Sequence, residues 1–148
     1  MSFTNQMKLE FLSLPANISF ARSTVASFAA QLEFTISDLE EIKVAVSEGV
    51  SNAIIHGYGN DKDKFVRIYA TLTVDTLKIV IEDEGKGIED IVKALQPAFT
   101  TDPERLGLGF VFMRSFMNDL QVESQPGQGT IVRMSRRVGA AAKNNREH

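Results

Sequence analysis

Three residues, Val74, Asp75 and Thr76, separate two stretches in which apolar and polar residues alternate. Alternation with a period of two is typical of strands with one buried face. A connection this short joins strands only as an antiparallel hairpin, because a parallel pair needs a crossover of a dozen or more residues. The apolar residues are Val66, Ile68, Ala70 and Leu72 before the turn and Leu77, Ile79 and Ile81 after it. The hairpin therefore argues against a doubly wound parallel sheet.

The remaining segments predict helices between groups of strands. Strands are expected at 7–11, from 120 and over 130–134, and helices over 15–32, 37–56 and 107–117, with a short helix at 88–95. The sequence Ser37-x-x-Glu40 predicts a capping box at the start of the second helix. Phe112, Met113, Phe116 and Met117 are the predicted apolar face of the third long helix. This order predicts an α+β fold, a two-layer sandwich with a mixed, mostly antiparallel sheet and helices on one face.

Composition limits the classes of protein that fit. The chain has 148 residues, no cysteine, a formal net charge of −3 and 43% hydrophobic residues. We expect one domain over residues 1–138 and a disordered tail over 139–148. The absence of cysteine excludes disulfides and thiolate metal sites. With no basic excess and no apolar run of about 20 residues, the sequence predicts a cytoplasmic protein that binds neither nucleic acid directly nor a membrane.

Glu48 and Asn52 are one turn apart on the second predicted helix. At 3.6 residues per turn they lie about 40° apart, on a stripe that borders the apolar face. The Asn52 carbonyl oxygen is a hard ligand of the kind that magnesium accepts beside phosphate oxygens, and the Glu48 carboxylate could accept a proton from a hydroxyl or water. The plainer interpretation of this pair is a solvated helix face.

Asp83 continues the core-facing row of Leu77, Ile79 and Ile81. A buried carboxylate needs hydrogen-bond donors, and the exocyclic amine of adenine is one; the alternative is that Asp83 only accepts bonds from the amides of the following turn. In that turn Gly85 and Gly87 would let the backbone approach a flat base closely.

A third element is Gly107-x-Gly109 at the start of a predicted helix. Backbone N–H groups at a helix N-terminus, together with the helix dipole, favour phosphate. No Gly-Lys-Ser/Thr follows, so the segment is not a Walker loop, and without a third glycine and a preceding strand it is not a dinucleotide fingerprint. Glycine pairs also serve as plain hinges.

Taken in order, these elements resemble the GHKL ATPase/kinase superfamily, which includes DNA gyrase, histidine kinases and MutL. The resemblance covers nearly the whole chain and implies a Bergerat-type ATP-binding sandwich that uses Mg²⁺. It implies that Glu48 is the catalytic carboxylate, that Asn52 binds Mg²⁺ and that Asp83 binds the adenine amine. The remaining implied contacts are Gly85 and Gly87 at the base, Gly107 and Gly109 at the phosphates, Thr130 at the adenine and an ATP lid over 96–105.

Within that superfamily, length excludes members with a second transducer domain, and His56 and His148 are poorly placed as phosphoacceptors. Segments at 20–28, 42–48, 52–58 and 97–101 resemble the anti-sigma-F family of sporulating Gram-positive bacteria. That resemblance implies a cytoplasmic, homodimeric protein-serine kinase. Such a kinase inhibits a sporulation sigma factor and phosphorylates a serine of its anti-anti-sigma antagonist.

The resemblance also adds Thr100, Thr101 and Arg105 to the lid contacts of the nucleotide. Two features depart from the family pattern: Gly49 stands where alanine is common, and the lid before Gly107 is short, with Leu106 in place of a small polar residue. Two alternatives stay open. One is a related stress-response anti-sigma kinase, and the other is a nucleotide-dependent sequestering module without kinase activity.

Overall fold

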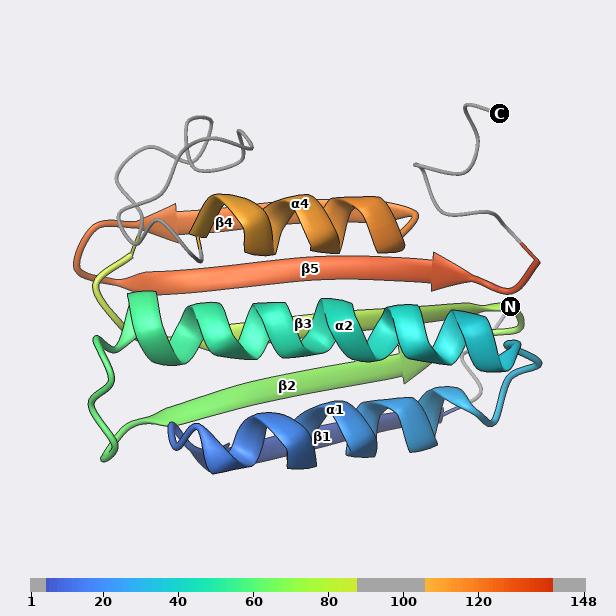
Figure 1. Cartoon of the computed structure of the whole chain (residues 1–148), viewed down its shortest axis with the longest axis horizontal. Coiled ribbons are helices and arrows are strands. Elements are labelled where there is room, and N and C mark those ends of the chain that lie inside the picture. The colour runs from blue at the N-terminus through green and yellow to red at the C-terminus, as the bar shows by residue number, and fades with distance from the viewer. Residues whose placement is uncertain (1–4, 88–105, 140–148) are drawn as a thin grey trace.

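The computed structural model describes residues 5–87 and 106–139, with side chains in the second range from Gly109 onward. Together these residues form a two-layer fold, with helices packed on a sheet (Figure 1). The elements are β1 (Asn5–Leu12), α1 (Ala16–Ala29), α2 (Ile36–Asn52), the π-helix η1 (Ala53–Gly57), β2 (Phe65–Leu72), β3 (Thr76–Asp83), α4 (Leu106–Phe116), β4 (Asp119–Gln125) and β5 (Gly129–Arg137). The predicted short helix at 88–95 and most of the predicted lid and tail lie outside the described residues.

The strands form one sheet in the order β1-β2-β3-β5-β4. The predicted hairpin is confirmed, since Leu72 pairs with Leu77 across the turn. All four pairings within the described residues are antiparallel, whereas a mixed sheet was expected. β5 lies between β3 and β4, so the last hairpin of the chain is attached to the first one through Asp83 and Thr130 at one end of the ladder.

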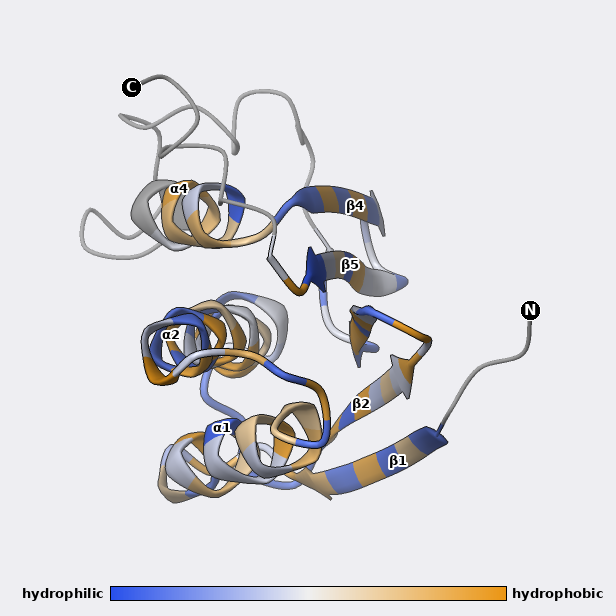
Figure 2. Cartoon of the chain, turned by 90° about the vertical axis from the view of Figure 1, so that its right-hand side faces the viewer, coloured by the Kyte–Doolittle hydropathy of each residue, from blue (hydrophilic) through white to orange (hydrophobic). Residues whose placement is uncertain are grey.

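The helices cover one face of the sheet, as predicted (Figures 1 and 2). Strand residues that point toward the helices are buried, among them Ile68, Ile79 and Ile81. The buried hydrophobic residues are Phe110 and Met113 on α4 and Met117 directly after it, whereas Phe112 is 40% exposed and stacks on Phe116. The predicted apolar face of this helix was therefore wrong at Phe112, because spacings of three and four from Met113 lead to Phe110 and Met117.

Gly49 lies where α2 approaches the sheet and α4 most closely. A Cβ at this position would lie 2.5 Å from Ile81 Cδ1 and 3.6 Å from the Met113 sulfur. The missing side chain therefore gives room to Ile81, which offsets the roughly 1 kcal/mol that glycine costs in a helix relative to alanine.

The cap of α2 is Thr35, two residues before the predicted Ser37. The Asp38 backbone N–H donates to the Thr35 hydroxyl at 3.0 Å, and the Thr35 N–H donates to Asp38 Oδ2 at 3.0 Å. The other Asp38 oxygen accepts from the buried guanidinium of Arg136 at 2.7 Å. Arg136 also binds Glu41 and the Phe116 carbonyl oxygen, so one arginine joins β5, the start of α2 and the end of α4. Arg136 therefore holds the Asp38 carboxylate that takes part in the cap of α2.

Thr35→Ala is expected to lower the free energy of unfolding by about 1 kcal/mol, because it removes the hydroxyl that accepts from the first turn of α2. Ser37→Ala is the matched control: Ser37 is also exposed and belongs to the same turn, but it lies inside the helix. Urea unfolding of the two variants measures the difference. Equal destabilisation by both would contradict the assignment of Thr35 as the cap.

No helix in the described part of the chain is both long and apolar enough to cross a membrane.

Candidate functional site

The C-terminal half of α2 presents Glu48 and Asn52 beside the first turn of α4. Asn52 is 8% exposed, and its side-chain oxygen is buried without a hydrogen-bond partner among the described residues. Burying a carbonyl oxygen without a hydrogen-bond donor costs about 1–3 kcal/mol of stability. A cation or a ligand donor bound to the Asn52 oxygen would remove this cost. The prediction that α2 brings this pair to the border of the core agrees with their positions.

Glu48 and Asn52 line a small cavity together with Ser51, His56 and Gly109. A Cβ built on Gly109 would lie 3.3 Å from Glu48 Oε1, so the carboxylate rests against the bare backbone of α4. Gly107 and Gly109 fall inside the first turn of α4, which begins at Leu106. The first four N–H groups of an α-helix have no partner within the helix. The cavity therefore combines a carboxylate, an amide oxygen and a site that favours anions.

The donor set fits magnesium in one specific way. Asn52 offers one hard oxygen ligand that is already desolvated. Among the described residues no group of three or more His, Asp or Glu side chains is placed to hold a metal ion. Magnesium commonly keeps several waters and binds one or two protein oxygens together with substrate phosphates. Asn52 would thus hold the ion only in combination with bound phosphate.

The π-helix η1 connects this cavity to Asp83. Its five residues, Ala53–Gly57, continue α2 with a wider turn that closes with the Tyr58 N–H bonded to the Ala53 carbonyl oxygen at 2.9 Å. The expected α-helix to His56 therefore changes form at Asn52. This turn places Gly57 beside β3. A Cβ on Gly57 would lie 2.6 Å from the Asp83 carboxylate. Only glycine fits at that distance.

Asp83 ends β3 on the helix-covered face and is 6% exposed. Burial raises the pKa of its carboxyl from 3.8 to about 6, while bonds from the backbone N–H groups of Gly85 and Thr130 oppose the rise. The Gly85 N–H donates to Oδ1 at 2.9 Å. The interpretation that Asp83 accepts from the following turn is therefore confirmed, and its bond to an adenine amine stays a prediction.

Gly85 and Gly87 make room for protein backbone. A Cβ at Gly85 would lie 1.9 Å from the Gly57 carbonyl oxygen, and one at Gly87 would lie 2.2 Å from the Gln125 carbonyl oxygen. Gly87 also has a φ of 78°, which favours glycine. The structure thus gives these glycines a packing role between turns, and their contact with a base stays a prediction.

Thr130 lies beside Asp83 on the neighbouring strand. It is buried, pairs with Asp83 in the ladder, and its hydroxyl lies 2.9 Å from that of Ser124. A Cβ on the preceding Gly129 would lie 2.1 Å from the Asp83 carbonyl oxygen. The predicted partners Asp83, Gly85 and Thr130 are therefore brought together at the open end of the sheet.

Three predicted site residues, Thr100, Thr101 and Arg105, lie outside the described residues. Sequence reasoning missed Ser51, His56 and Gly57 as site residues. Ser51 and His56 follow Glu48 at spacings of three and eight, which could have placed them on its face of the helix. No local signal distinguished Gly57 from an ordinary helix stop.

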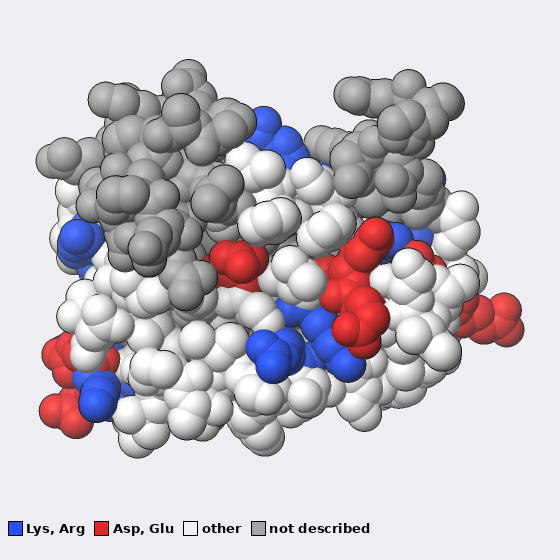
Figure 3. All heavy atoms as spheres, viewed as in Figure 1, with Lys and Arg blue, Asp and Glu red and all other residues white. Residues whose placement is uncertain are grey.

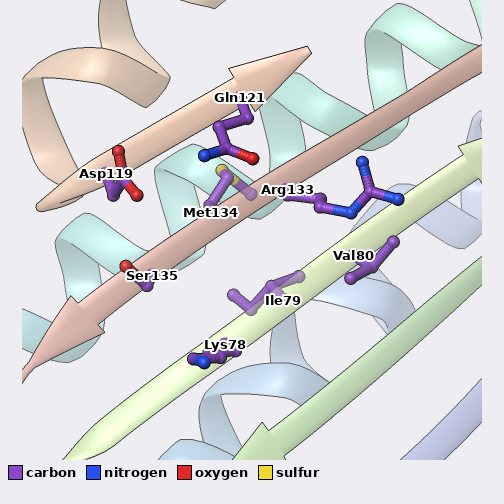
Figure 4. Close-up of a pocket in the computed structure, with 8 residues that line it drawn as sticks. All are labelled: Lys78, Ile79, Val80, Asp119, Gln121, Arg133, Met134 and Ser135. Atoms are coloured by element: carbon purple, nitrogen blue, oxygen red, sulfur yellow. The ribbon is translucent and has the colours of Figure 1, made fainter. Parts of the chain in front are cut away.

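A second hollow, of about 220 Å³, lies on the opposite face of the sheet between β3, β5 and β4 (Figure 4). Lys78, Gln121 and Arg133 are among the residues that line it, and none of the predicted site residues is. Arg133 already pairs with Glu123 at 2.6 Å, so the charge of this arginine is matched. The hollow is separate from the site on the helix side.

Comparison with known families identifies the domain. Residues 11–136 match the family of histidine kinase-like ATPase domains. The chain is 54% identical over 142 residues to the anti-sigma F factor of Thermoanaerobacter sp. strain X514, covering 95% of this chain and 99% of that protein. It is 49% identical over 136 residues to the anti-sigma F factor of Bacillus subtilis strain 168, covering 90% of this chain and 93% of the relative.

Solved structures support the same fold at low sequence identity. The RsbU and RsbW domains of a Mycobacterium tuberculosis protein superpose with a TM-score of 0.66 at 18% identity, covering 90% of this chain and 32% of that one. The catalytic domain of the histidine kinase ThkA superposes with a TM-score of 0.58 at 15% identity, covering 90% and 98%. The fold is thus that of GHKL ATPase domains, and on sequence the chain belongs to the anti-sigma F factor family.

Proposed function

We propose that this chain is an anti-sigma factor and a protein-serine kinase. It binds a sporulation sigma factor and holds it inactive, and it uses Mg-ATP to phosphorylate a serine of an anti-anti-sigma antagonist. The proposal places it in the cytoplasm as a homodimer. Its relatives are named anti-sigma F factors, which supports the sigma-factor partner. The histidine kinase-like ATPase family supports the nucleotide.

The observation that carries the kinase proposal is the cavity shared by Glu48, Asn52 and Gly109. A domain that only binds nucleotide needs phosphate contacts and a base pocket, but it does not need a carboxylate beside the phosphate-binding turn. Glu48 Oε1 lies against the position of Gly109 in the first turn of α4. A carboxylate held there is near the place where the terminal phosphate of a nucleotide bound at that turn would end.

In the proposed reaction the serine oxygen of the antagonist forms a bond to the γ-phosphorus of ATP. The bond from that phosphorus to the β,γ-bridging oxygen breaks, and ADP leaves. Glu48 accepts the serine hydroxyl proton, and the N–H groups of Gly107 and Gly109 donate to the phosphates. Asn52 holds Mg²⁺, which neutralises charge on the phosphates when it is bound. Most of the rate then comes from positioning and charge stabilisation.

At the other end of the site, Asp83 accepts a hydrogen bond from the adenine amine in this proposal. The groups around the carboxylate leave it fixed and desolvated, so such a bond would be strong. Thr130 adds polar contact to the base, and Thr100, Thr101 and Arg105 close over the nucleotide as the lid.

On the helix-covered side, acidic and basic side chains adjoin one another (Figure 3), and Lys43 pairs with Glu40 there. The charges of these two side chains are therefore already paired within α2.

The test combines the purified chain with γ-labelled ATP, Mg²⁺ and the candidate antagonist. We expect label on the antagonist and none on a variant whose acceptor serine is replaced by alanine. A parallel transcription assay with sporulation and stress-response sigma factors identifies the inhibited partner. Retention of nucleotide and sigma factor without any phosphoprotein would contradict the kinase proposal and leave a sequestering module. Inhibition of only the stress-response sigma factor would contradict the choice of partner.

A further inference from the structure

Tyr58 joins three elements beside the proposed base pocket. Its hydroxyl donates to the Phe65 carbonyl oxygen, at the start of β2, at 2.6 Å. The Tyr58 hydroxyl oxygen in turn accepts from the backbone N–H of Glu84, just after β3, at 2.7 Å. Tyr58 itself follows η1 directly. One hydroxyl therefore ties the end of the π-helix to the ends of two strands.

The bond to Glu84 lies in the backbone between two groups of the base pocket. Asp83 precedes Glu84, and Gly85, which donates to the Asp83 carboxylate, follows it. On the other side, Gly57 precedes Tyr58 and faces the same carboxylate, while its carbonyl oxygen accepts from the Lys86 N–H at 2.8 Å. The Tyr58 and Gly57 contacts thus hold the chain on both sides of Asp83.

The backbone of Tyr58 is held by hydrogen bonds on both sides of the residue. Its backbone N–H closes the π-turn, and its carbonyl oxygen accepts from the Asp61 N–H at 3.0 Å. The next two residues, Gly59 and Asn60, have φ values of 58° and 66°, which mark a sharp reversal of the chain. Burial, aided by the nearby Asp83 carboxylate, raises the pKa of the phenol, so the hydroxyl keeps its proton at neutral pH and makes both bonds.

We propose that Tyr58 is a positioning residue for adenine recognition: its hydroxyl fixes the backbone at Glu84 and thereby sets the direction in which the Asp83 carboxylate meets the exocyclic amine. This inference rests on the proposed function, because it takes Asp83 as the acceptor for that amine. Tyr58 touches neither base nor phosphate in this assignment. Its effect on a ligand passes through Asp83.

The test measures the affinities of ATP and purine riboside triphosphate, which differs from ATP by lacking the amine. The wild-type chain is expected to prefer ATP. Tyr58→Phe keeps the ring and removes both hydrogen bonds of the hydroxyl. We expect the ATP preference to fall about five-fold, the usual effect of one hydrogen bond, with little change in the affinity for the analogue. A general loss of stability would weaken both ligands equally.

The matched control is Tyr69→Phe, at the only other tyrosine in the chain. Tyr69 lies on β2 opposite Val80, three residues before Asp83 on β3, with the Lys8 ammonium over its ring. It is expected to leave the ATP preference unchanged. An unchanged preference in Tyr58→Phe, with or without an equal loss of both affinities, would overturn the positioning role while leaving the proposed function intact. A wild-type chain without any preference for ATP over the analogue would instead overturn the adenine contact of Asp83, and this inference with it.

Discussion

Glu48→Gln is expected to slow phosphoryl transfer to the antagonist by roughly 10²–10⁴-fold, the range usual for loss of a general base. Glutamine keeps the size of the side chain and its contact with the position of Gly109, but it cannot accept the serine proton at neutral pH. Binding of ATP and of the sigma factor should change little. Single-turnover transfer of label measures the chemical step, and equilibrium binding of a fluorescent nucleotide measures the affinity.

Glu40→Gln is the control for this prediction, because it makes the same change on the same helix at a side chain that is 64% exposed and pairs with Lys43. It should leave the rate of transfer unaltered. If Glu48→Gln transferred phosphate at the wild-type rate, Glu48 would not be the base. An equal loss of nucleotide affinity and rate would instead mean that the carboxylate serves binding.

Asp83→Asn should produce two opposite effects, a weaker site and a more stable fold. Asparagine turns an amide N–H₂ or a neutral oxygen toward the base, so ATP affinity is expected to fall roughly 10- to 100-fold, as when a hydrogen bond to a charged group is lost. The neutral side chain no longer requires a buried charge at pH 7. Isothermal titration with ATP and urea unfolding of the same samples measure both effects.

The pH dependence fixes the sign of the stability effect. The pKa of Asp83 is raised in the fold to about 6 from 3.8, so between about pH 4 and pH 6 the folded state binds more protons than the unfolded state. Stability contributed by this group therefore falls as the pH rises through that window. This difference of about two pKa units corresponds to roughly 3 kcal/mol. That figure is the upper bound for the increase in the free energy of unfolding that Asp83→Asn produces at pH 7.

Asp75→Asn, in the exposed hairpin turn, is the reference for this comparison. It should leave the ATP affinity unchanged, and its pH profile of stability is the baseline for that of Asp83→Asn. Because other carboxylates titrate in the same range, the difference between the two variants is the informative quantity. A less stable Asp83→Asn at pH 7 would show that the charged form is favoured in the fold.

The sheet was readable from the sequence because its signal is local. Alternation in β2 and β3, with a turn of three residues, defines both strands and the face that meets the helices. Asp83 could be placed on that face by counting from Ile79 and Ile81. The position of β5 between β3 and β4 was not readable, since it depends on pairings between residues about fifty positions apart, such as Asp83 and Thr130.

The start of α2 shows where local reasoning failed. Ser37-x-x-Glu40 and Thr35-x-x-Asp38 both satisfy the capping pattern, and the sequence offers no choice between them. Thr35 is the cap in the structure because its partner Asp38 is also held by Arg136, which lies 98 positions away. Local reasoning failed for the glycines of the site in a similar way. Their positions were evident, but whether backbone or ligand fills the space beside Gly85 depends on Gly57, which lies on another element.

The contacts at the two ends of α2 have a consequence for ligand binding. One end is anchored to Arg136 through Asp38, and the other continues through η1 until Gly57 meets Asp83. Because α2 and η1 are held by these contacts, the distance between the cavity at Glu48 and the carboxylate at Asp83 stays constant. The spacing of the two proposed half-sites is then set before a ligand binds, so little ordering entropy is lost from this part of the protein on association. The segment from Glu48 to Gly57 therefore sets the distance between the two proposed half-sites, and a ligand too short to span that distance can reach only one of them.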